Sequence, residues 1–133
     1  MSIQYAGKFI WLLILLCSFA ESANAHHAYA ADFDPNTNGS AKGTIIEIFY
    51  RNPHVQYYFE VKQEDGTSKT WGAIMQSIGA VTRVGMKKDT FSVGDEIEVY
   101  GRMGRNARPI IWAQTITKSD STVFDLGKTG PLK

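Results

Sequence analysis

The sequence contains three histidines, and their placement is its most distinctive chemical feature. His26 and His27 are adjacent in the stretch ESANAHHAYA, and His54 closes the stretch RNPH. Neutral imidazole nitrogen is a common ligand of transition-metal ions, and nitrogen-rich sites favour copper over zinc. Whether these residues meet depends on how the chain is processed and on which elements position His54.

The first 25 residues have the layout of a secretory signal peptide. Phe9 to Ala20 form an uncharged apolar run that follows Lys8 and precedes small and polar residues. A run of about 10 to 14 apolar residues is too short to span a membrane and is typical of a signal core. We expect a periplasmic or secreted protein with no membrane span in its mature form.

Small residues at Ala23 and Ala25 match the A-x-A rule for cleavage after Ala25. Cleavage after Ala23 would put Glu21 where a small residue is preferred, and cleavage after Ala30 would lie far from the apolar run. The sequence therefore predicts a signal peptide over residues 1–25 and a mature chain that begins at His26.

The composition excludes several functions. Removing Lys8 and Glu21 with the leader leaves 13 basic and 12 acidic residues of the original 14 and 13. Such a neutral chain does not attract a polyanion, so we expect no nucleic-acid partner. The single cysteine, Cys17, lies within the leader, which excludes a disulfide or a blue-copper centre in the mature chain. About 108 mature residues are typical of one domain.

Residues 26–42 show turn signals without hydrophobic periodicity. Short β-rich runs separated by turns come after them. We interpret 26–42 as an extended lead-in. The expected strands are residues 43–50, 55–61, 69–75, 96–103 and 110–117, with a short helix within 76–85 between the third and fourth strands. This order predicts an all-β, OB-fold-like, five-stranded Greek-key barrel over residues 43–118. An open β-sandwich is the alternative, and residues 119–133 are predicted to form a flexible tail.

The alternation of residues within these runs indicates which side chains point toward the core. The second strand should place Val55, Tyr57, Phe59 and Val61 on one face. Both Trp71 and Trp112 are expected in the core because they lie in alternating strands. His54 falls in the corner between the first two strands, next to the surface that OB folds use for ligands.

Several motifs together resemble a family of small exported bacterial proteins of unknown function that begin H-H-[SA]-[FY]-A after the leader. They are His26-His27-Ala28-Tyr29-Ala30, Phe33-Asp34, Gly43-Thr44, Asn52-Pro53-His54, Trp71, and Val93-Gly94-Asp95 before Val99 and Gly101. The resemblance covers nearly the whole mature chain. It implies an exported OB-like domain, and it transfers no catalytic residue.

The residues themselves suggest a metal site. If His26 is the first residue, its α-amine and its ring nitrogen can chelate one ion, and His27 or His54 can add a second imidazole. We therefore expect copper, or alternatively zinc, at His26, His27 and His54. The simpler alternative is that the histidine pair is solvated and that His54 donates a hydrogen bond that fixes its turn.

No motif of a nucleophilic hydrolase or a metalloprotease occurs, so we expect no enzymatic activity. The alternative function is a metal-free interaction module of the cell envelope. It would dock a protein or envelope component through a barrel face near Tyr58, Trp71 and the basic hairpin 102–108. The sequence leaves the partner and the oligomeric state open.

Overall fold

The computed structural model describes residues 31–129. The strands described below belong to the compact unit that begins at Phe33. The predicted leader, residues 1–25, and both His26 and His27 lie outside the described residues. Within the described range, no helix is long and apolar enough to cross a membrane.

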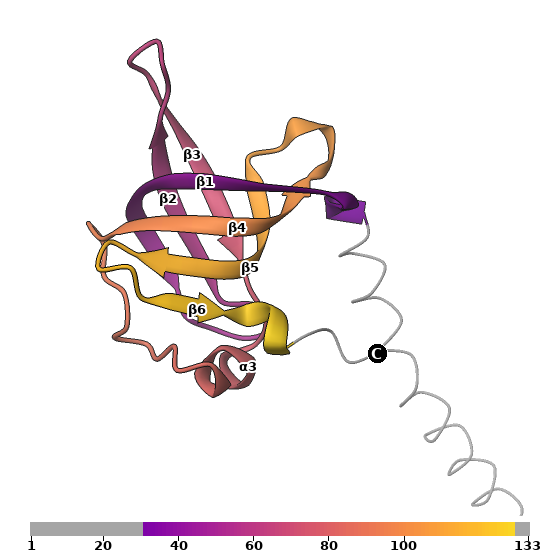
Figure 1. The fold of residues 1–133 in the computed structure, drawn as a ribbon, viewed down its shortest axis with the longest axis vertical. Coiled ribbons are helices and arrows are strands. Elements are labelled where there is room, and N and C mark those ends of the chain that lie inside the picture. Colours follow the sequence, from indigo (N-terminus) through magenta and orange to yellow (C-terminus); the bar gives the residue numbers. More distant parts are fainter. Residues whose placement is uncertain (1–30, 130–133) are drawn as a thin grey trace, which may run out of the picture. The chain divides into compact units, whose positions relative to one another are not determined.

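The described chain is built mainly from strands (Figure 1). One short α-helix lies between β3 and β4 and two 3₁₀ turns follow later. The elements are β1 (Phe33–Phe49), β2 (Gln56–Lys62), β3 (Ser68–Ile74), α3 (Ile78–Arg83), β4 (Glu96–Gly104), η1 (Arg105–Ala107), β5 (Ile110–Lys118), β6 (Val123–Asp125) and η2 (Leu126–Thr129).

Strand pairing closes five strands into a ring. The bent strand β1 pairs antiparallel with β4 through its first part and with β2 through its last part. Strand β2 pairs with β3, β4 pairs with β5, and a short parallel pairing of β3 with β5 completes the ring. The order β1-β2-β3-β5-β4 confirms the predicted all-β fold with a short helix after the third strand.

The prediction of a lead-in over 26–42 is wrong for residues 33–42, which are part of β1. Asn38 to Thr44 pair one to one with Arg102 to Glu96 across the β1–β4 ladder. Only Phe33 and Ala41 are buried in this part of the strand. This part of β1 is a strand because it pairs with β4. It has no alternating apolar pattern of its own, and the sequence therefore suggested a loop. The folded unit therefore begins at Phe33 and not at residue 43.

The prediction of a flexible tail over 119–133 is wrong for its described part. Strand β6 pairs with Thr115 to Thr117 of β5, and Leu126 is fully buried in the core. Burial of the large apolar side chain of Leu126 holds this segment against the core. The segment's glycines had suggested a flexible tail. The barrel thus has a sixth strand that the sequence pattern did not reveal.

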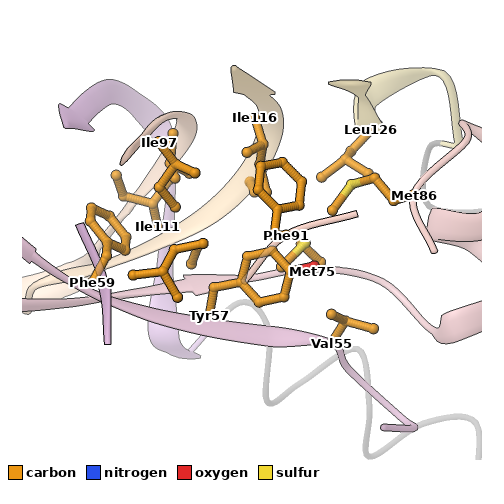
Figure 2. Close-up of a cluster of buried hydrophobic side chains, with 14 of the residues drawn as sticks. Val55, Tyr57, Phe59, Met75, Met86, Phe91, Ile97, Ile111, Ile116 and Leu126 are labelled. Atoms are coloured by element: carbon orange, nitrogen blue, oxygen red, sulfur yellow. The ribbon is translucent and has the colours of Figure 1, made fainter. Parts of the chain in front are cut away.

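The core forms from the inward positions of the alternating strands, as predicted for Val55, Tyr57 and Phe59, all of which are fully buried. Figure 2 shows how side chains from several strands and from the segment before β4 converge, with the Tyr57 and Phe91 rings 5.5 Å apart. The cluster comprises Ala41, Ile45, Val55, Tyr57, Phe59, Ala73, Met75, Val81, Met86, Phe91, Ile97, Val99, Ile111, Ala113, Ile116 and Leu126. No charged side chain within residues 31–129 is buried.

Two strand glycines permit close approach between backbones. A Cβ atom at Gly101 would clash with the Trp112 carbonyl oxygen, and one at Gly43 would clash with the Glu60 carbonyl oxygen. Gly101 lies where the β4–β5 register shifts. Both glycines therefore allow neighbouring strands to bend around a small barrel.

Candidate functional site

The corner between β1 and β2 is held against the start of α3 by several hydrogen bonds. The backbone N–H of Ile78 donates to Asn52 Oδ1 over 3.0 Å. The Val55 N–H donates to the Gln76 carbonyl over 3.1 Å, and the Met75 N–H donates to the Val55 carbonyl over 2.9 Å. Asn52 thus satisfies one of the unpaired amides at a helix start. This part of the Asn-Pro-His motif has a clear structural role.

His54 is half-buried at this corner, and one of its ring nitrogens is fixed. Its Nδ1 lies 2.9 Å from the Met75 carbonyl oxygen. A carbonyl oxygen can only accept, so Nδ1 carries the hydrogen and the neutral ring has its lone pair on Nε2. Histidine ligands in metal sites commonly donate their second N–H to a backbone carbonyl in this way. His54 has the tautomer that suits metal binding through Nε2.

An aromatic group on the outside of the barrel flanks His54. The Trp112 and His54 ring centroids are 5.3 Å apart at an interplanar angle of 80°, and the Phe33 ring lies 5.8 Å from Trp112. The prediction that Trp112 packs in the core is wrong, because its neighbours Ile111 and Ala113 point inward. Trp71 does pack against the core.

The sequence reasoning missed Phe33 as a member of this group. In the sequence, Phe33 is a single aromatic residue between Asp32 and Asp34. Such a pattern is more typical of a loop than of the start of a strand. Only its pairing with Gly104 and its contact with Trp112 reveal its place.

Of the three predicted metal ligands, the structure describes only His54. His26 and His27 lie outside the described residues, so the geometry of the set is a prediction. Within residues 31–129, no group of three or more histidine, cysteine or acidic side chains could hold a metal ion. The described part therefore offers His54 as one candidate ligand and not as a complete site.

The surface proposed for the alternative function also differs from expectation. Tyr58 and Trp71 lie on opposite faces of the sheet, since Tyr58 pairs with Gly72 and Trp71 packs against the core. On the outside, the Tyr58 ring lies 5.8 Å from Phe49, and the Arg51 guanidinium lies 4.7 Å above the Phe49 ring. The outer aromatic surface is therefore built from Phe49 and Tyr58 instead of Tyr58 and Trp71.

Asp34 in β1 and Asp65 in the β2–β3 turn serve local backbone geometry. Hydrogen bonds from the Asn36 backbone and the Thr37 hydroxyl lower the pKa of Asp34. The hydroxyl and the amide of Thr67 lower the pKa of Asp65 in the same way. Both carboxylates stay ionised at neutral pH and accept hydrogen bonds from residues two or three positions ahead in the chain.

Comparison with known proteins gives a family and no activity. No curated protein matches the chain. The model of a family of unknown function matches residues 13–110, which is most of the sequence. The chain therefore belongs to the family of unknown function DUF6152.

Proposed function

We propose that this chain is an exported binding module that holds a copper-type ion through His26, His27 and His54. The observation that carries the proposal is the hydrogen bond from His54 Nδ1 to the Met75 carbonyl, 2.9 Å long. It leaves Nε2 as the metal-binding nitrogen of the neutral ring, and no other hydrogen bond reaches that ring within the described residues.

The segment between His27 and the barrel would have to carry both histidines to this nitrogen. Five residues, 28–32, separate His27 from Phe33, and Ala31 and Asp32 are helical, so the four steps from His27 to Ala31 would span at most about 13 Å. Phe33 contacts Trp112, which in turn contacts His54. That His26 and His27 bind the same ion as His54 is part of the proposal.

The expected ligands explain the preference for copper. An α-amine and two or three imidazoles make a nitrogen-rich set without thiolate, which favours Cu²⁺ over Zn²⁺. Protons compete for the same atoms, because imidazole has a pKa of about 6.5 and an α-amine one of about 7.7 to 8.0 in model peptides. Copper affinity should therefore fall as the pH drops from about 8 to 5.

A copper titration of the exported chain, with its first residue established by intact mass, tests the proposal. We expect His54→Ala to weaken copper binding by about tenfold or more, since one of few ligands is lost. Val93→Ala is a suitable control because Val93 is 64% exposed and lies in the turn before β4. A chain with one alanine added before His26 should also bind more weakly. Equal affinities of the wild-type and His54→Ala chains, or a first residue at Ala31, would rule the site out.

The outer aromatic surface favours a second candidate function, a metal-free module that docks a component of the cell envelope. The observation that supports this function is the contact of the Phe49 ring with the Tyr58 ring and with the Arg51 guanidinium on the outside of the barrel. Photo-crosslinking in cells from position 58, with position 93 as the control, tests it. A specific crosslink at position 58 together with unchanged copper affinity in His54→Ala would favour this function over the first.

A further inference from the structure

Gly72 of β3 lies on the outside of the barrel and is nevertheless buried. Its neighbour Ala73 is fully buried in the core, so the alternation along the strand places Gly72 on the outer face. A Cβ atom at Gly72 would lie 3.3 Å from Cε1 of Tyr58 and 3.4 Å from Cγ2 of Ile110. The Tyr58 ring from β2 and the Ile110 side chain from β5 therefore meet above Gly72 and cover it.

These outward side chains continue to β1. The Phe49 ring lies 5.8 Å from the Tyr58 ring at an interplanar angle of 90°, and the Arg51 guanidinium lies 4.7 Å above the Phe49 ring. Phe49, Tyr58 and Ile110 are half-buried, and none of them belongs to the core cluster or to the hydrophobic side chains packed against it. The outer aromatic surface thus continues as an apolar strip over β1, β2, β3 and β5, which spans roughly 14 Å at a strand spacing of about 4.8 Å.

Hydrogen-bond donors and an acceptor border this strip. The Tyr58 hydroxyl donates to Gln56 Oε1 over 3.2 Å, which leaves the amide N–H groups of Gln56 as donors. The Arg51 guanidinium adds further donors. Glu47 lies directly opposite Tyr58 in the β1–β2 ladder, and its exposed carboxylate is an acceptor on the same face. A ligand on the strip can therefore both donate and accept hydrogen bonds at the edge of an apolar surface.

The charges around Tyr58 favour a neutral ligand over a polyanion. Glu47 counters the charge of Arg51, and the exposed Glu60 adds a second carboxylate on the outer face of β2. A polyanion such as a nucleic acid draws its affinity from several basic contacts. A neutral sugar fits better, because the C–H groups on the face of its ring pack on an aromatic side chain. The hydroxyls at the edge of the sugar bond to carboxylate, amide and guanidinium groups.

We infer that the outer aromatic surface binds a neutral oligosaccharide. A sugar ring packs on the ring of Tyr58. Its hydroxyls bond to the polar side chains that border the strip, which are Glu47, Gln56 and Arg51. The inference rests on the second candidate function, docking of an envelope component, and names the chemical class of that component. It is independent of the copper proposal, because His54 takes no part in it.

Calorimetric titration of the chain with three neutral hexasaccharides, cellohexaose, maltohexaose and N-acetylchitohexaose, tests the inference. We expect at least one of them to bind and, in amide NMR spectra, to shift the signals of Tyr58 and Gly72. Tyr58→Ala should weaken this binding by about tenfold, because it removes the aromatic ring on which the sugar packs. Tyr58→Phe keeps the ring and should bind nearly as the wild type does. Tyr100→Ala is the matched control, since Tyr100 is an exposed tyrosine on β4, which contributes no side chain to the strip.

A second variant tests the polar border of the strip without disturbing the packing over Gly72. Glu47 is exposed, so Glu47→Ala should fold as the wild type does. The substitution removes a charged acceptor of the sugar hydroxyls and should weaken hexasaccharide binding by about tenfold. Glu98→Ala is its control, because Glu98 is an exposed glutamate on β4, away from the strip. This pair decides the matter if Tyr58→Ala fails to fold.

The outcomes separate the inference from the function on which it rests. The inference is overturned if none of the three hexasaccharides binds at millimolar concentration, or if Tyr58→Ala and Glu47→Ala bind as the wild type does. An oligothymidylate that binds more tightly than every hexasaccharide also overturns it. If sugar binding is absent while position 58 gives a specific crosslink in cells, the second candidate function stands with a different ligand class. If both sugar binding and the crosslink are absent, the inference and the second candidate function fall together.

Discussion

The interior of the barrel and the outer corner at His54 are built from the same strands and differ in chemistry. The interior holds side chains such as Phe59, Ile111 and Val99, which are fully buried and apolar. The corner holds His54 and Trp112, which are half-buried and contact each other from β5 and from the loop before β2. Inside, polar atoms are rare; outside, an imidazole is oriented by a backbone carbonyl.

The difference teaches that stability and the proposed copper binding should be separable in this protein. Burial of apolar side chains supplies most of the free energy of folding, and it depends on packing in the interior. The proposed copper binding needs a polar atom that is held in place and reachable from water, and the His54 ring at the outer corner is such a group. Substitutions on the two sides should therefore affect different measurements.

The largest effect is expected for Phe59→Ala in the interior. Phe59 is fully buried, and truncating a buried phenylalanine typically costs about 3 to 5 kcal/mol because it leaves a cavity. Urea unfolding at 25 °C measures the loss. Val93→Ala, at a 64% exposed position, should change stability by less than about 0.5 kcal/mol. Folded Phe59→Ala should bind copper as the wild type does. If its copper affinity were as low as that of His54→Ala, interior packing and the proposed copper binding would not be separable.

A smaller effect is expected for Asn52→Ala at the outer corner. The substitution removes the acceptor of the Ile78 N–H at the start of α3, and losing a capping side chain costs about 1 kcal/mol. Amide hydrogen exchange at Ile78 should become faster. Asn36→Ala is the matched control, because the Asn36 side chain is exposed and only its backbone N–H is bonded. Equal exchange rates at Ile78 in both variants would exclude a capping role.

Tyr57→Phe tests a buried polar atom of the interior. The Tyr57 hydroxyl is buried and has no hydrogen-bond partner within the described residues. Removing it should leave stability at pH 7 unchanged or raise it by up to about 1 kcal/mol, because an unpaired buried hydroxyl is unfavourable. A loss of more than about 1 kcal/mol would show that this hydroxyl is bonded in solution.

The same substitution has a predicted pH signature. Burial, together with the nearby Tyr50, raises the pKa of Tyr57 well above 10. A raised folded-state pKa means that the stabilisation is present below about pH 10 and is lost as the pH rises further, while the unfolded chain ionises. Tyr57→Phe should therefore lose less stability above pH 10 than the wild type. Tyr100→Phe, at an exposed position, should behave like the wild type in alkaline unfolding.

The smallest effect is expected for Asp65→Asn in the β2–β3 turn. Hydrogen bonds from Thr67 lower the pKa of the exposed Asp65 carboxylate. A lowered folded-state pKa gives stabilisation that is present above the unfolded pKa and is lost as the pH falls. The difference in stability between Asp65→Asn and the wild type should therefore be small at neutral pH and shrink further below pH 4. A difference that grows under acid would contradict this account of the turn.

Much of the fold follows from local patterns in the sequence. Alternation identifies β2 and its inward face, and the Asp65-Gly66 pair marks the hairpin that joins β2 to β3. Apolar residues at Ile78 and Val81 mark α3. These signals are local, because each depends on neighbours within one strand, one turn or one helical turn.

The sequence by itself therefore determined the all-β class, most strand positions and the placement of His54 at a corner. Only the tertiary structure decided that residues 33–42 join β1, that Leu126 anchors the chain end, and that Trp112 faces outward beside His54. Ile110, Ile111 and Trp112 are all apolar, so alternation alone cannot tell which of them points inward. That choice is made by the register with β4 and β3, which depends on residues far away in the chain.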